Sequence, residues 1–180
     1  MTDWNLYQLD NALFPLVNEA KPLEEILQNF QSKFVVAKIE MFSAKLGLIT
    51  KNRADVSLIS QLEQTLELVE TDMTIFFRLL SEIDKQSTSD AALEYLQPAF
   101  YNVAQLEPTI ITQWKDWLSQ YLFRLQQETV DDSYREKIMK QVNPKYVLRN
   151  YMAQLAIDAA DQGDYTNCLL YTSPSPRDRG

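Results

Sequence analysis

The stretch NPKYVLRNYMAQLAIDAADQGDY, residues 143–165, indicates the fold class most clearly. Asn143 is a residue type that caps helix amino termini, Pro144 suits the first helical position, and Gly163 suits the position after the last turn. Apolar side chains recur between these boundaries at helical spacing, at Val147, Leu148, Tyr151, Leu155 and Ile157. The pattern predicts an amphipathic α-helix that begins at Asn143 and ends before Gly163.

The same three- and four-residue spacing of apolar side chains runs toward the amino terminus and predicts further helices. These helices are expected over 3–17, 22–47 and 55–69, from 72 onward, over 90–98 and 108–125, and over 133–142. No stretch shows the alternation of a β-strand, and the 180 residues include only three glycines. The sequence therefore predicts an all-α fold without a fixed-period repeat.

Several residues mark the expected helix boundaries. Pro15 should kink or end the first helix because it lacks an amide proton. Gly47 should cap the end of the second helix, and the Asp72 carboxylate should cap the start of a later one. Asp90 is a candidate cap, while Ser133 and Glu136 have the spacing of a capping box.

The composition excludes several kinds of chemistry. The chain has no histidine, one cysteine and a net charge of −8. Histidine acid–base catalysis and Cys/His zinc sites are therefore excluded. The acidic surface also disfavours a nucleic-acid partner, and with it the hypothesis of a helix-turn-helix protein that binds nucleic acid. Neither GxGxxG nor GxxxxGK[ST] occurs, so the sequence offers no phosphate cradle. No cofactor is expected to bind this segment.

Paired acids and paired aromatics are the remaining candidates for a site. Glu24 with Glu25 and Asp131 with Asp132 lie at expected helix starts, where negative charge favours the helix dipole. Asp158 and Asp161 could share a metal, but a solvated helix face explains them more simply. The pairs Phe76/Phe77 and Trp114/Trp117 fit a core better than a ligand pocket.

Arg149 and Asn150 stand between apolar neighbours in the predicted last helix. An unpaired buried arginine is costly, so Arg149 should meet a carboxylate. It would act either as a structural ion pair or as a brace for a functional surface of a larger protein. Both interpretations remain open from the sequence alone.

The last residues, CLLYTSPSPRDRG (168–180), differ in character from the rest of the chain. They resemble a sequencing-library adapter translated in one frame, so residues 168–180 are expected to be an artefact, with a disordered native tail as the alternative. No apolar stretch approaches the length of a membrane-spanning helix, and no signal-peptide pattern is present. A soluble protein of the cytoplasm, or of mitochondria in a eukaryote, is the expectation.

Three motifs carry a family resemblance: KLGL (45–48), DMTIFFRLL (72–80) and the stretch 143–165. Together with WNLYQLDNALFPLV (4–17) and the Trp114/Trp117 helix, they resemble the carboxy-terminal part of the selenoprotein O family. The resemblance implies a kinase-like fold, or pseudokinase, that binds ATP in reversed orientation. With magnesium it would transfer AMP to Ser, Thr or Tyr hydroxyls of proteins. The family's catalytic residues precede the region matched here, so no catalytic, cofactor-binding or metal-binding residue is assigned.

The resemblance divides the chain into residues 1–48, which would continue the kinase-like C-lobe, 49–167, a helical extension, and 168–180, the foreign tail. Arg78, Asn143, Pro144, Arg149 and Asn150 are the bracing candidates. The expected partners are the upstream catalytic lobe and the substrates of the whole enzyme. The alternative is a self-standing helical interaction module without enzymatic activity. Exposed apolar stripes on the first helices would favour the first hypothesis.

Overall fold

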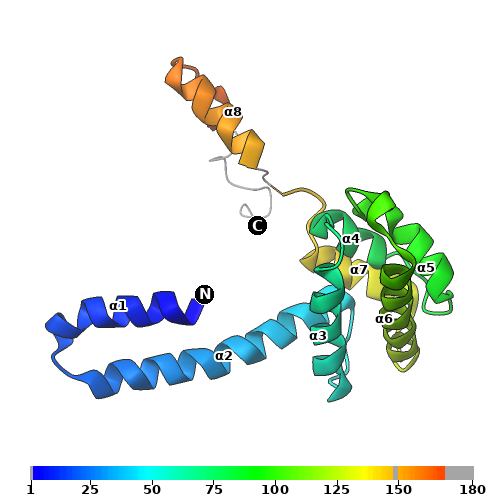
Figure 1. Ribbon diagram of the computed structural model, residues 1–180, viewed down its shortest axis with the longest axis horizontal. Coiled ribbons are helices and arrows are strands. Elements are labelled where there is room, and N and C mark those ends of the chain that lie inside the picture. Colours follow the sequence, from blue (N-terminus) through cyan, green and yellow to red (C-terminus); the bar gives the residue numbers. More distant parts are fainter. Residues whose placement is uncertain (1, 148–149, 169–180) are drawn as a thin grey trace. The chain divides into compact units, whose positions relative to one another are not determined.

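The computed structural model describes residues 2–147 and 150–168 and divides the chain into two units, Met1–Pro144 and Lys145–Gly180 (Figure 1). The first unit contains α1 (Thr2–Val17), α2 (Ala20–Leu46), α3 (Ala54–Leu66), α4 (Met73–Leu80), α5 (Ser89–Leu96), the 3₁₀ turns η1 (Gln97–Ala99) and η2 (Val103–Gln105), α6 (Pro108–Gln126) and α7 (Asp132–Val142). The second contains α8 (Asn150–Asp161). Within the described ranges the only β pairing is an isolated bridge between Thr71 and Phe100, which confirms the all-α prediction.

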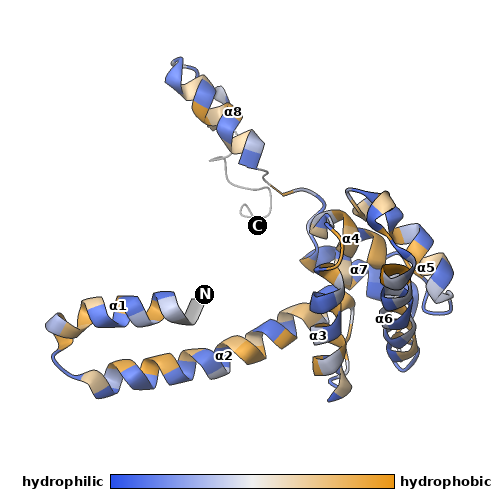
Figure 2. Cartoon of the chain, in the orientation of Figure 1, coloured by the Kyte–Doolittle hydropathy of each residue, from blue (hydrophilic) through white to orange (hydrophobic). Residues whose placement is uncertain are grey.

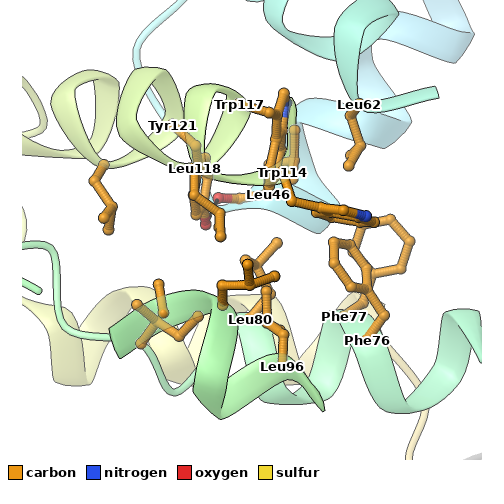
Figure 3. Packing of buried hydrophobic residues seen from close by; sticks show 14 of the residues in the cluster. Leu46, Leu62, Phe76, Phe77, Leu80, Leu96, Trp114, Trp117, Leu118 and Tyr121 are labelled. Atoms are coloured by element: carbon orange, nitrogen blue, oxygen red, sulfur yellow. Dashed lines mark hydrogen bonds between the residues drawn. The ribbon is translucent and has the colours of Figure 1, made fainter. Parts of the chain in front are cut away.

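An aromatic cluster forms the core of the first unit (Figure 3). Trp114 and Trp117 of α6 are buried, and their rings meet edge to face with centroids 6.2 Å apart. Phe76 of α4 lies 5.7 Å from the Trp114 ring, and Tyr121 stacks on Trp117 at 5.2 Å. The two aromatic pairs therefore belong to the core, as the sequence predicted. Leu46, at the end of α2, is fully buried in the same cluster.

Helices α1 and α2 pack against each other as a hairpin within the first unit. Pro15 does not end α1, which runs on to Val17 before Asn18 turns the chain at a φ of 58°. The carboxy-terminal part of α2 contacts α3, α4 and α7. Leu46 and Leu48 enter the core together on either side of residue 47, and the predicted domain boundary at 48/49 stays a prediction.

Two of the expected helix caps are present and two are replaced. The Asp72 carboxylate accepts hydrogen bonds from the amides of Thr74 and Ile75 at 2.9 and 3.1 Å, as predicted. At α7 the predicted capping box is wrong, because the cap is Asp131, which accepts from the Tyr134 amide at 2.7 Å. At α5, Thr88 serves as the cap in place of Asp90. In both cases an acceptor two residues upstream bonds to the free amides instead.

The predicted helix start at Asn143 is also wrong. α7 ends at Val142, Asn143 continues in extended conformation, and α8 begins at Asn150. Asn143 is buried and its side chain bonds to residue 45, so it is not available to cap a following helix. Gly163 does follow α8 in left-handed conformation with a φ of 84°, as predicted. The foreign tail predicted at 168–180 lies, beyond Cys168, outside the described residues and stays a prediction.

Gly47 closes α2 in the left-handed conformation, with a φ of 70°. A Cβ at this position would lie 2.7 Å from Met139 Sδ and 2.8 Å from Arg135 Cγ. We therefore expect Gly47→Ala to lower the free energy of unfolding by about 2 kcal/mol, combining left-handed strain with overpacking. Urea unfolding followed by tryptophan fluorescence measures the change. Gly163→Ala is the control, since nothing lies within 4 Å there; equal losses would contradict the packing argument.

Candidate functional site

Two of the acidic pairs singled out in the sequence, Asp131/Asp132 and Asp158/Asp161, include residues that make structural contacts. Asp131 caps α7, and its neighbour Asp132 contacts Arg135 at 3.0 Å. Asp158 accepts a hydrogen bond from Gln154 at 2.7 Å on α8. Within residues 2–147 and 150–168, no group of three or more His, Cys, Asp or Glu side chains could hold a metal ion. No described helix is long and apolar enough to cross a membrane.

Three buried charged residues form an ion-pair network between α3 and α6. Arg124 Nε lies 2.7 Å from Asp55 Oδ1, and Arg124 Nη1 lies 2.9 Å from Glu128 Oε1. All three side chains are at most 5% exposed. Burial alone would lower the pKa of Arg124, but the hydrogen bonds and charges of Asp55 and Glu128 raise it above the usual value. The guanidinium is therefore held in its charged form.

The same network fixes the loop between α2 and α3, residues 47–53. Glu128 accepts hydrogen bonds from the amides of Ile49 and Thr50 at 3.2 and 3.1 Å and from the Thr50 hydroxyl at 2.8 Å. Arg124 donates to the Thr50 carbonyl. Because backbone amides rarely remain unpaired when enclosed, these bonds replace the water that a free loop would use. The polar groups of Thr50 and the amide of Ile49 are thus held by Arg124 of α6 and by Glu128 in the turn after it.

Sequence reasoning missed this ion-pair network. A signal was present in YLFRLQQE, residues 121–128, where an arginine interrupts an apolar helix face and a glutamate follows at i+4. The second carboxylate, Asp55, stands 69 residues earlier, and nothing local connects it to Arg124.

A groove adjoins the outer side of the fixed loop. It has a volume of about 540 Å³ and lies between the second half of α2 and the loop. Its apolar wall includes Val36, Ile39, Leu48 and Ile49. Val36 is 55% exposed and Ile49 44% exposed, so the groove presents uncovered apolar surface to solvent.

Two bracing candidates, Arg78 and Asn143, meet at a junction of α2, α4 and α7. The Asn143 side chain donates to the Lys45 carbonyl at 3.0 Å and accepts from Lys45 Nζ at 3.1 Å. Arg78 donates to the Asn143 carbonyl at 3.3 Å. Lys45 Nζ also lies 4.7 Å from the Phe77 ring centre, and partial burial lowers the pKa of Lys45.

The other bracing candidates do not join this junction. Pro144 is exposed after α7, and Asn150 is exposed at the start of α8. Arg149 lies outside the described residues. The structure thus brings together two of the five candidates, at a position where three helices of the first unit are linked.

Apolar residues recur along both helices of the α1–α2 hairpin (Figure 2), and many of them are exposed. Leu16 is 83% exposed, Trp4 66% and Ile26 63%. The exposed apolar residues of the hairpin are Trp4, Tyr7, Leu9, Leu13, Phe14, Leu16, Val17, Ile26, Phe34, Val35, Val36 and Met41. Along most of the hairpin, both helices present apolar side chains that the first unit does not bury.

Comparison with known proteins shows which proteins this chain is similar to. The family model described as protein adenylyltransferase SelO matches residues 1–172. The chain is 52% identical over 163 residues to the protein nucleotidyltransferase YdiU of Flavobacterium johnsoniae, an alignment that covers 91% of this chain and 31% of that protein. The corresponding proteins of Aromatoleum aromaticum and Rhodopirellula baltica are 41% and 39% identical, with 90% and 91% of this chain and 30% and 32% of each relative covered. The chain spans about a third of the length of these relatives.

Proposed function

Because the chain belongs to the protein adenylyltransferase SelO family, we propose that it is a non-catalytic, carboxy-terminal part of a protein adenylyltransferase. In this proposal the whole protein has a kinase-like, pseudokinase fold and transfers AMP from ATP to Ser, Thr or Tyr hydroxyls of other proteins with the help of Mg²⁺. The chain itself supplies no catalytic residue. It packs on the catalytic lobe and stabilises it, in the cytoplasm or, in a eukaryote, in mitochondria.

The observation that carries this proposal is the uncovered apolar face of α1 and α2. Many large apolar side chains of the hairpin are exposed, and monomeric proteins rarely leave large apolar patches in water. In the proposed arrangement, the hairpin continues the kinase-like lobe, and the lobe covers residues such as Leu16 and Ile26. The relatives' greater length is consistent with such a lobe, because the matched region accounts for only 31% of the first relative.

The alternative is a self-standing interaction module that uses the same face for a separate protein partner. The well-formed core of the first unit favours it, since Trp114, Leu118 and Tyr121 are fully buried without any further domain. The two functions differ in where the partner of the face resides. In the first it belongs to the same polypeptide, and in the second to another molecule.

Ile26→Asp distinguishes these functions when it is measured both in this chain and in the whole protein. We expect the free energy of unfolding of this chain to change by less than about 0.5 kcal/mol, because Ile26 is exposed on α2. In the whole protein we expect a loss of about 2 kcal/mol, because a carboxylate would replace a buried side chain at the contact with the lobe. Chemical unfolding of both proteins, with protein AMPylation from labelled ATP, measures the two effects.

The matched control is Tyr134→Ser on α7, where Tyr134 is 52% exposed and outside the hairpin. It should change neither protein by more than about 0.5 kcal/mol. A whole protein that tolerates Ile26→Asp as well as this chain does would contradict the packing role. A chain that transfers AMP by itself would contradict the non-catalytic assignment.

A further inference from the structure

An apolar stripe runs along the side of α2 that faces α1. Its members are Leu23, Leu27, Phe30, Phe34 and Met41. Successive members are four, three, four and seven residues apart, and these spacings return to one side of a helix with 3.6 residues per turn. Leu27 and Phe30 line a hollow together with Trp4 of α1, so this side of α2 is the one that α1 packs on.

The stripe is covered only as far as α1 reaches. Leu23 is 8% exposed, and Leu27 and Phe30 are half-buried, but Phe34 is 47% and Met41 46% exposed. The two helices are antiparallel, and α2 runs on past the start of α1 toward α3 (Figure 1). Burial of the stripe therefore ends where α1 begins.

The covered and uncovered parts of the stripe form one surface. The rings of Phe30 and Phe34 stack with their centroids 5.8 Å apart, so the apolar surface beside α1 continues directly into the exposed part. The groove beside α2 lies on another side of the helix, because Val36 is two residues beyond Phe34 and thus about 200° around the axis. The exposed part of the stripe is a continuation of the α1–α2 interface and not of the groove.

Polypeptide that enters α1 lies in line with the exposed part of the stripe. Phe30, beside the start of α1, and Met41 are eleven residues apart on α2, which is about 16 Å at 1.5 Å per residue. About eleven helical residues or roughly five extended ones span that distance. A segment of about a dozen residues before α1 is therefore long enough to cover Phe34 and Met41, whether it is helical or extended.

We infer that the exposed part of the stripe, Phe34 and Met41, binds the segment of the same polypeptide that directly precedes α1. Apolar side chains of that segment pack on Phe34 and Met41 as those of α1 pack on Leu27 and Phe30. This inference rests on the proposed function, because it requires the chain to be part of a longer protein. It adds to the proposed packing a defined contact at the point where the catalytic lobe passes into the helical part.

Photo-crosslinking in the whole protein tests this contact. The photoreactive residue p-benzoylphenylalanine replaces Met41 in one variant, Ile26 in a second and Val36 in a control. Val36 is the matched control because it is 55% exposed on the same helix but on another side. After irradiation and digestion, mass spectrometry identifies the linked peptides. A mixture of isotope-labelled and unlabelled protein distinguishes links within one molecule from links between two copies.

We expect residue 41 to link to a peptide from the dozen or so residues directly before α1 of the same molecule. The yield of that link should be several times the yield from residue 36. Phe34→Asp should reduce the yield at residue 41 several-fold, because it places a carboxylate within the apolar contact. Val36→Asp should leave the yield unchanged. Circular dichroism melting of each variant verifies that it is folded.

The outcomes separate this inference from the proposed function. If residue 26 links to the catalytic lobe while residue 41 links to nothing, to a second copy or to another protein, the inference is wrong and the proposed function stands. If residue 41 links as expected but residue 26 does not link to the lobe, the inference stands and the proposed packing at Ile26 is wrong. If neither position links within the same molecule, both are wrong. Equal yields from residues 41 and 36 would contradict a contact confined to the stripe.

Discussion

Replacing Arg124 with methionine will lower the free energy of unfolding of this chain by about 3–5 kcal/mol, because the substitution leaves buried carboxylates without their counter-charge. Asp55 and Glu128 are only 3% and 4% exposed, so water cannot replace the guanidinium. Methionine keeps most of the length of the side chain, which limits the loss of packing. Urea unfolding, followed by both tryptophan fluorescence and circular dichroism, gives the difference.

A surface ion pair and a triple variant provide the controls. Lys38→Met removes the pair with Glu63, where the atoms lie 2.7 Å apart but both side chains are more than a third exposed, and should cost less than about 1 kcal/mol. The triple variant Asp55→Leu, Arg124→Met, Glu128→Met removes every charge of the network and should be more stable than Arg124→Met alone. A loss below 1 kcal/mol for Arg124→Met would show that the network does not hold the loop.

Replacing Asn143 with serine will lower the free energy of unfolding by about 3 kcal/mol, because serine is too short to form the two side-chain bonds to Lys45. One of those bonds is made to the charged Nζ at 3.1 Å, and the other satisfies the Lys45 carbonyl at 3.0 Å. Hydrogen bonds to charged groups contribute about 1.5–3 kcal/mol and neutral ones about 1. Thermal or urea unfolding of the chain measures the effect.

The serine substitution separates the observed role of Asn143 from the predicted one. Serine and asparagine are about equally good helix caps, so a cap at residue 143 would tolerate the change. Thr88→Ser at the cap of α5 is the matched control and should be nearly neutral. A neutral result at Asn143 would restore the capping interpretation and remove the junction with Lys45 as a bracing contact.

The residue types used to predict helix starts and ends were correct where the capping contacts lie within one or two helical turns. Asp72 caps α4 and Gly47 closes α2, both as expected from residue type. These predictions failed where a neighbouring residue capped the helix instead, or where a residue distant in the sequence bonded to the predicted capping side chain. Asp131 displaced the Ser133 box, and Lys45 engaged Asn143 across 98 residues of sequence.

The candidate site was predicted less well than the helices. The bracing set contained Arg78 and Asn143, which do meet, but it also contained Pro144 and Asn150, which lie exposed. The Arg124 network was absent from the prediction because an arginine on an apolar helix does not reveal its partner. Asp55 becomes that partner only when α3 packs on α6.

The sequence by itself determined the all-α fold and the family. Helical periodicity is a local property, since side chains at i, i+3 and i+4 share a face whatever the rest of the chain does. Only the tertiary structure decided which of those faces are buried. Burial of Trp114 and Trp117 agreed with the prediction, but only the tertiary structure left the apolar side chains of α1 and α2 uncovered and placed Arg124 between two carboxylates. Burial depends on which helices meet, and that choice is made by long-range packing rather than by spacing along the chain.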